Sequence, residues 1–163
     1  MKYAILTVFF IVISVLQTTV LKSIEILGTV PNLLVVAVIC YALMRGDFRS
    51  IIFGAASGIV LDFLSGRMVG MNMILCSLTA LLCACLYENL FNNNSFVASV
   101  FVLWISAIYE FLIYVFYFLF WGNTDIIYVL LHKILPCSVY NAAAAFAIYP
   151  IMKIICSFDK EEE

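Results

Sequence analysis

The chain consists of long apolar runs separated by short polar segments. A helix needs about 20 apolar residues to cross the hydrocarbon core of a bilayer. Three runs meet that length: Tyr3 to Leu21, Gly70 to Leu90 and Phe96 to Trp121. Each predicts a membrane-spanning helix. The third run carries tyrosines and a tryptophan at its far end, which is typical of an aromatic belt at a membrane interface.

Two further apolar runs are short, Asn32 to Met44 and Ile51 to Leu64. Fourteen residues of helix rise only about 21 Å, so these elements must recruit flanking residues, thin the bilayer or pack behind longer neighbours. Arg45 and Arg49 lie between the two runs. We therefore expect a tight helical hairpin with a basic turn, in which Asp47 caps the second helix.

The C-terminal part predicts one more span, Leu135 to Ile155, with Pro136 tolerated in its first turn. The segment from Ile126 to Lys133 either lies along the interface or belongs to this span. Six spans place both termini on one side, and the positive-inside rule favours the cytoplasm. That orientation puts Lys2, Arg45, Arg49, Lys153 and Lys160 inside, and Lys22, Arg67 and Lys133 outside.

Composition strengthens the membrane interpretation. The 163 residues are 66% hydrophobic and 11% charged, whereas a soluble domain is nearer half apolar and a quarter charged. We expect an all-α polytopic membrane protein with about six transmembrane helices, formed by residues 1–163 as a single integral membrane domain. No basic patch is present to meet nucleic-acid phosphates, and no nucleotide-binding loop is visible.

Candidate chemistry is sparse. The six cysteines lie in apolar runs without a C-x-x-C pair, and we interpret them as small packing residues. His132 is the single histidine and cannot build a metal site alone. No serine or cysteine has a histidine and an acid placed to activate it. The sequence therefore predicts neither a catalytic site nor a metal or cofactor.

A four-residue spacing marks the second short run and its continuation. Positions four apart share one helix face, and small residues at that spacing let another backbone come close in membranes. Gly66 is expected to end the helix. We interpret this set as helix-packing or partner-binding residues: Gly54, Gly58, Asp62, Gly66 and Gly70.

The position of Asp62 has to be explained, because an acid inside an apolar segment is energetically costly. A structural role, in which its carboxylate bonds to the Ser65-Gly66-Arg67 turn or pairs with Arg67, is favoured over a proton-linked role. The other intramembrane acid, Glu110, is either neutral or bonded to Gln17, Thr18 or Asn72 of another span. The polar residues Gln17, Thr18 and Thr19, together with Asn141, are expected to supply interhelical hydrogen bonds.

Several of these features together resemble the MreD family of the bacterial rod-shape machinery. They are Gln17-Thr18-Thr19 at the end of the first span, the Pro31-Asn32-Leu33-Leu34 entry to the second, and Gly54-x-x-x-Gly58-x-x-x-Asp62-x-x-Ser65-Gly66-x-x-x-Gly70. The resemblance covers nearly the whole chain. Where the family often has Asp after the proline, this chain has Asn32, which removes a charge there.

The resemblance implies a non-enzymatic scaffold in the bacterial cytoplasmic membrane. Its expected partners are an MreC-like bitopic protein and, indirectly, MreB filaments and peptidoglycan synthases of the elongation machinery. The implied fold is similar to the S component of energy-coupling-factor vitamin importers. A vitamin-binding transport subunit is the alternative, but the Ala-x-x-x-Ala stripe typical of that class is absent, since Val8 follows four residues after Ala4. A third hypothesis is an ion carrier that uses Asp62 and Glu110.

Overall fold

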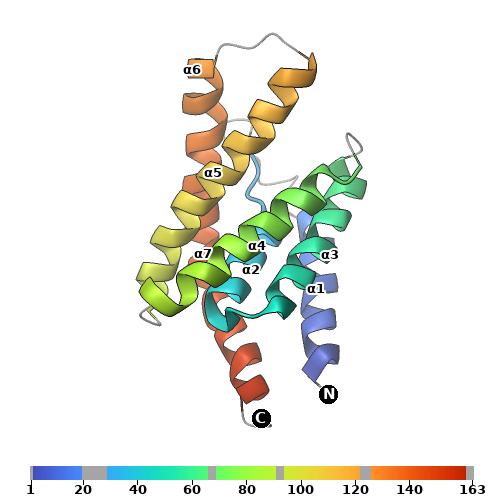
Figure 1. Cartoon of the computed structure of the whole chain (residues 1–163), viewed down its shortest axis with the longest axis vertical. Coiled ribbons are helices and arrows are strands. Elements are labelled where there is room, and N and C mark those ends of the chain that lie inside the picture. Colours follow the sequence, from blue (N-terminus) through green and yellow to red (C-terminus); the bar gives the residue numbers. More distant parts are fainter. Residues whose placement is uncertain (1, 20–28, 66–68, 91–93, 122–125, 161–163) are drawn as a thin grey trace.

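The computed structural model describes residues 2–19, 29–65, 69–90, 94–121 and 126–160. These residues form helices joined by short turns (Figure 1). In chain order the elements are α1 (Lys2–Thr19), α2 (Leu33–Arg45), α3 (Phe48–Ser65), α4 (Met71–Leu90), α5 (Ser95–Trp121), α6 (Ile126–Val129), the π-helical turn η2 (Leu130–Ile134) and α7 (Leu135–Lys160).

Within the described residues, three helices are long and apolar enough to cross a membrane: Phe48–Ser65, Ser95–Phe116 and Ile127–Ser157. Three shorter helices are also apolar: Leu6–Thr19, Leu33–Arg45 and Met71–Leu86. This confirms the predicted all-α polytopic membrane protein.

The short helix α2 forms the centre of the bundle. Every side chain from Leu34 to Leu43 is at most 3% exposed, and α2 contacts α1, α3, α4, α5 and α7. Of the three explanations for its length, packing behind longer neighbours is therefore the correct one. Gly46 ends the helix in the left-handed conformation, with φ of 63°, which glycine adopts without steric cost.

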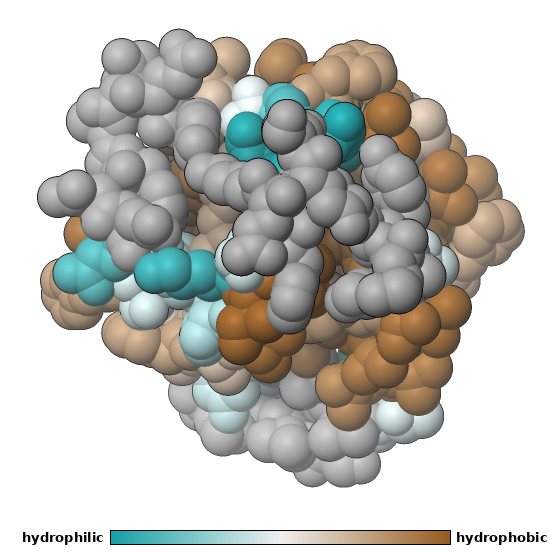
Figure 2. All heavy atoms as spheres, turned by 90° about the horizontal axis from the view of Figure 1, so that it is seen from below, coloured by the Kyte–Doolittle hydropathy of each residue, from teal (hydrophilic) through white to brown (hydrophobic). Residues whose placement is uncertain are grey.

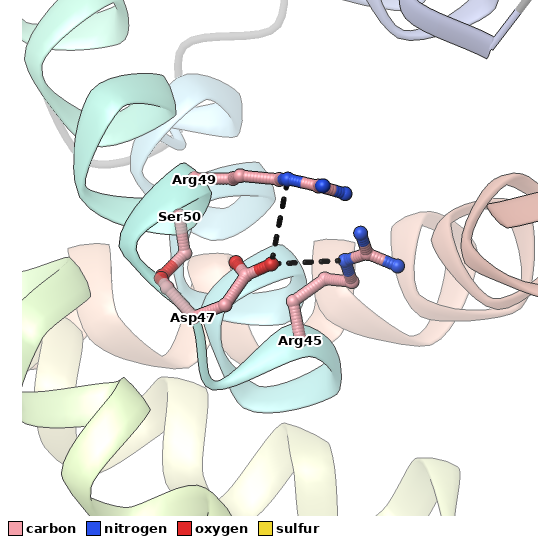
Figure 3. Close-up of polar contacts among 4 residues, drawn as sticks. All are labelled: Arg45, Asp47, Arg49 and Ser50. Atoms are coloured by element: carbon pink, nitrogen blue, oxygen red, sulfur yellow. Dashed lines mark hydrogen bonds and ion pairs between the residues drawn. The ribbon is translucent and has the colours of Figure 1, made fainter. Parts of the chain in front are cut away.

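The second short helix, α3, instead recruits flanking residues. It begins at Phe48 rather than Ile51, and its 18 residues rise about 27 Å. The prediction that Asp47 caps it through the side chain was wrong. One carboxylate oxygen of Asp47 lies 3.5 Å from Arg45 Nε and 3.9 Å from Arg49 Nε (Figure 3). The described part of the chain places no donor on the other oxygen, because the carboxylate turns toward the two arginines.

The C-terminal helix is longer than predicted. Residues 126–160 are helical throughout, so Ile126 to Lys133 is part of the last helix rather than a separate interfacial segment. At η2 the amide of Leu135 donates to the carbonyl of Leu130, a wider turn than in an α-helix. Pro136 follows directly, and its ring would clash with the carbonyl four residues earlier in a regular helix. The π turn accommodates this proline without ending the helix.

Both termini lie at the same end of the molecule (Figure 1), as an even number of spans requires. The turn between α2 and α3, with Arg45 and Arg49, faces this end. Seen from there, hydrophilic residues gather in groups between apolar side chains (Figure 2). One end of the bundle is therefore marked by polar and basic residues.

Candidate functional site

The closest helix pair in the site is α3 with α4, and glycines make it possible. A Cβ added at Gly58 would overlap the Cα of Met73 and the carbonyl oxygen of Asn72. A Cβ at Gly54 would lie 2.7 Å from the carbonyl oxygen of Cys76. Real Cβ atoms do not approach a backbone this closely, so at both positions the backbone of α4 occupies the space of a side chain. The helix that meets the glycine stripe is α4.

One turn beyond Gly58, the carboxylate of Asp62 caps the start of α4. One of its oxygens accepts from the amides of Gly70 at 2.9 Å and Met73 at 3.2 Å. The other accepts from the backbone amide and the side-chain amide of Asn72, both at 3.0 Å. The first N–H groups of a helix have no partner within the helix, and in lipid each unpaired group is costly. Asp62 removes that cost from a neighbouring helix.

The partners of Asp62 differ from those predicted. The expected turn included Gly66 and Arg67, which lie outside the described residues, as does any contact between Arg67 and Asp62. The described donors come instead from residues 70–73. Asp62 itself is 2% exposed. Its buried position is explained by the four donors that surround it.

The network extends from α4 to α5. The hydroxyl of Tyr109 donates to Asn72 Oδ1 at 2.8 Å, and the thiol of Cys76 lies 3.6 Å from the same hydroxyl. Tyr109 is 1% exposed. Sequence reasoning missed this residue, although a tyrosine in the middle of a span, away from the interfacial belt, is a signal for a buried hydrogen bond.

Glycine is required at position 70 for a different reason than at Gly54 and Gly58. Its φ is +96°, and an added Cβ would meet nothing within 4 Å. Its amide donates to Asp62, and its carbonyl oxygen accepts from Ile74 at 3.1 Å. Gly70 therefore shapes the backbone turn that presents the first amides of α4 to the carboxylate.

A second polar cluster surrounds the start of α2. Gln17 of α1 donates to the carbonyl of Pro31 at 3.2 Å and accepts from the amide of Leu33 at 2.8 Å. Asn141 of α7 accepts from the amide of Asn32 at 2.7 Å, and Asn32 in turn accepts from the amide of Val35 at 3.3 Å. The start of α2 is capped by its own Asn32 and, like that of α4, by side chains of other helices.

Two predictions about this cluster need correction. Thr18 and Thr19 donate to carbonyls of their own helix, at 2.7–3.3 Å, rather than to another span. Glu110 does bond to another span, but its partner is the thiol of Cys137 at 3.6 Å rather than Gln17, Thr18 or Asn72. A hydroxyl near a helical carbonyl four residues earlier finds a partner without leaving its helix.

The polar side chains of this arrangement are engaged in hydrogen bonds with one another and with helix ends. Among the described residues, no group of three His, Cys, Asp or Glu side chains could hold a metal ion. Of the six cysteines, which are all free, Cys85 is exposed and the others are buried. The polar side chains of the site bind the ends of helices to one another.

A comparison with protein-family models bears on the whole chain. Residues 1–158 match the family described as rod shape-determining protein MreD. The chain belongs to the MreD family. The resemblance expected from the sequence is thereby confirmed. No curated protein and no solved structure matches the chain, so the likeness to S components stays a prediction.

Membership of the MreD family gives the chain a role in determining rod shape, as part of the shape machinery. With its apolar helices, it is a multi-pass protein of a bacterial membrane. The match supports shape determination and gives no support to the vitamin-transport alternative. Asp62 and the glycine stripe therefore have to be understood within a shape-determining membrane protein.

The glycine contacts generate a stability prediction. Gly58→Ala should lower the free energy of unfolding by about 1–3 kcal/mol, because the new methyl group overlaps backbone that has no room to retreat. Gly54→Ala should cost less, since its nearest contact is less severe. Unfolding by SDS titration of the protein in mixed micelles measures both.

Ala56→Val is the matched control, because Ala56 lies on the exposed face of the same helix. Its free energy of unfolding should stay within about 0.5 kcal/mol of the parent. An unchanged value for Gly58→Ala would contradict the close approach of α3 and α4.

Proposed function

We propose that this MreD-family chain is a non-enzymatic membrane scaffold of the cell elongation machinery. In this proposal it binds an MreC-like bitopic protein and helps to couple MreB filaments to peptidoglycan synthesis. Residues 1–158 match the rod shape-determining family, and this observation carries the proposal. The whole chain, residues 1–163, acts as a single integral membrane domain.

The use of the buried polar groups supports a scaffold. Asp62 is surrounded by four donors that hold the start of α4, and Gln17 and Asn141 hold the start of α2. An acid that serves as a proton carrier must exchange its proton with water or a relay, whereas both oxygens of Asp62 are engaged in hydrogen bonds that hold a helix end. These residues therefore support a structural role.

We place the partner contact on the α3–α4 hairpin. The stripe of Gly54, Gly58 and Asp62 is covered by α4 and is not itself a free surface. It acts on partner binding by fixing the distance and angle between the two helices. The outward faces of α3 and α4 then present a rigid surface to a transmembrane helix of the partner.

The orientation follows from the basic end of the molecule. We propose that both termini are cytoplasmic, which puts Arg45, Arg49 and Lys153 on the cytoplasmic side. The shared end of the termini (Figure 1) and the exposure of Arg49 and Lys153 support this, since cytoplasmic loops carry an excess of basic residues. The turn between α2 and α3 then faces the compartment of the MreB filaments.

Depletion of the chain in its own rod-shaped cells tests the proposed function. Cells should become round within a few generations, because the link between filaments and wall synthesis is lost. Microscopy of cell width and length measures the effect, with re-expression of the parent chain as the control. Normal rods after complete depletion, in cells without a second copy, would rule out the function.

Asp62→Ala tests the role of the hairpin in partner binding. The variant should still insert into the membrane but should retain several-fold less MreC in a pull-down from solubilised membranes, because α4 loses the cap that fixes its position. Asp47→Asn, at the opposite end of α3, is the control and should retain parental amounts. Equal MreC yield from parent and Asp62→Ala would remove the hairpin from the proposal.

A further inference from the structure

Polar contacts connect the helices at one level of the bundle. Asn32 meets Asn141, Leu33 meets Gln17, and Asn72 meets both Asp62 and Tyr109. Glu110, next to Tyr109, meets Cys137, which lies one turn before Asn141 and joins the two groups. Hydrogen-bonded groups are adjacent. The residues that carry them therefore lie at the same height along the bundle axis, to within about one helical turn, or 5 Å. We name this level the polar layer. Its residues are Gln17, Asn32, Asp62, Asn72, Tyr109, Glu110 and Asn141.

On the side of the termini, the helices reach charged residues at a common distance from the polar layer. Arg45 lies thirteen positions after Asn32, the N-cap of α2, and Asp62 lies thirteen positions after Arg49 in α3. Lys153 lies twelve positions after Asn141 in α7. At 1.5 Å per residue, each distance is about 18–20 Å. Arg45, Arg49 and Lys153 therefore mark one membrane boundary.

On the other side of the polar layer, the helices have two different heights. From Asn141 the C-terminal helix continues for eight residues to Lys133, about 12 Å. Lys133 and Lys153 are thus about 30 Å apart along the helix, which is the thickness of the hydrocarbon core. On α5, Trp121 lies twelve residues beyond Tyr109, about 18 Å. These helices form the tall side.

The other helices end soon after the polar layer. α1 ends two residues after Gln17, and α3 ends three residues after Asp62, which is only about 3–5 Å. α2 and α4 begin at the polar layer itself. In Figure 1, α5 and α6 extend past the ends of α3 and α4. Helices α3 and α4 therefore form a short side, about 8 Å lower than the tall side.

The short side exposes apolar side chains at the polar layer. Phe63 of α3 is 75% exposed and Ile74 of α4 is 68% exposed. The chain enters α4 through a turn at Val69 and Gly70, and Val69 is 86% exposed. Irregular backbone that faces lipid is costly inside the hydrocarbon. The bilayer avoids that cost when it thins beside the turn.

We propose that the protein thins the bilayer on one side. Headgroups and water of the leaflet nearer Lys133 reach the polar layer beside α3 and α4, whereas beside α5 and α7 the hydrocarbon keeps its full thickness up to Lys133. The partner of this surface is the lipid bilayer. The inference rests on helix lengths and contacts alone and describes the chain without a bound MreC helix, which would cover the same outward faces of α3 and α4.

Four single-cysteine variants at the polar layer test this inference. Phe63→Cys and Ile74→Cys lie on the short side, and Ile108→Cys and Val139→Cys are matched controls on the tall side. The controls are 52% and 49% exposed, so all four thiols face outward. Each variant is made in a Cys85→Ala background, because Cys85 is exposed. The full chain is placed in nanodiscs of dioleoyl lipids and treated with a charged, membrane-impermeant maleimide.

The maleimide needs water to reach a thiol, so its rate of reaction reports local bilayer thickness. We expect Phe63→Cys and Ile74→Cys to react at least tenfold faster than the two tall-side variants, with equal rates for all four after denaturation in SDS. Protection of all four thiols in nanodiscs would show a bilayer of full thickness around the protein and overturn the inference. Rapid reaction of all four would overturn it as well, because the polar layer would then lie at the bilayer surface.

Discussion

The first N–H groups of a helix have no partner within that helix, and the need to pair them shapes the whole bundle. Both α2 and α4 begin at the polar layer, beside other helices. The carboxylate of Asp62 caps α4, and the side chains of Gln17 and Asn141 hold the start of α2. Each of these three side chains belongs to another helix, so the contact that satisfies a helix end also fixes the position of its neighbour. Capping and tertiary packing are therefore one interaction here.

This dual use of polar groups connects the fold with the function. Glycines bring α3 against α4, and Asp62 locks the pair at one end. Tyr109 then ties α4 to α5, and α5 packs against the long C-terminal helix. The result is a set of short helices held rigidly beside two tall ones. A member of a shape-determining family gains from such rigidity, because a scaffold works through the constant geometry of its surfaces.

The sequence predicted the spans and the face of the glycine stripe, because apolar run length and four-residue spacing are local properties. It did not predict which helix meets the stripe, since Met73 and Cys76 become neighbours of Gly58 and Gly54 only through tertiary packing. The donors to Asp62 lie eight to eleven residues further along the chain, beyond any local rule. The sequence left open whether Ile126 to Lys133 joins the last span, because the polar pair His132-Lys133 and Pro136 together resemble a helix stop.

Backbone hydrogen exchange, followed by NMR, tests the capping of α4 most directly. The amides of Gly70, Asn72 and Met73 should exchange at least tenfold more slowly in the parent chain than in Asp62→Ala, because the variant leaves them without an acceptor. The amide of Val35, which is capped by Asn32, should exchange at the same rate in both. Equal rates for Gly70, Asn72 and Met73 in the two proteins would contradict the claim that Asp62 holds the start of α4.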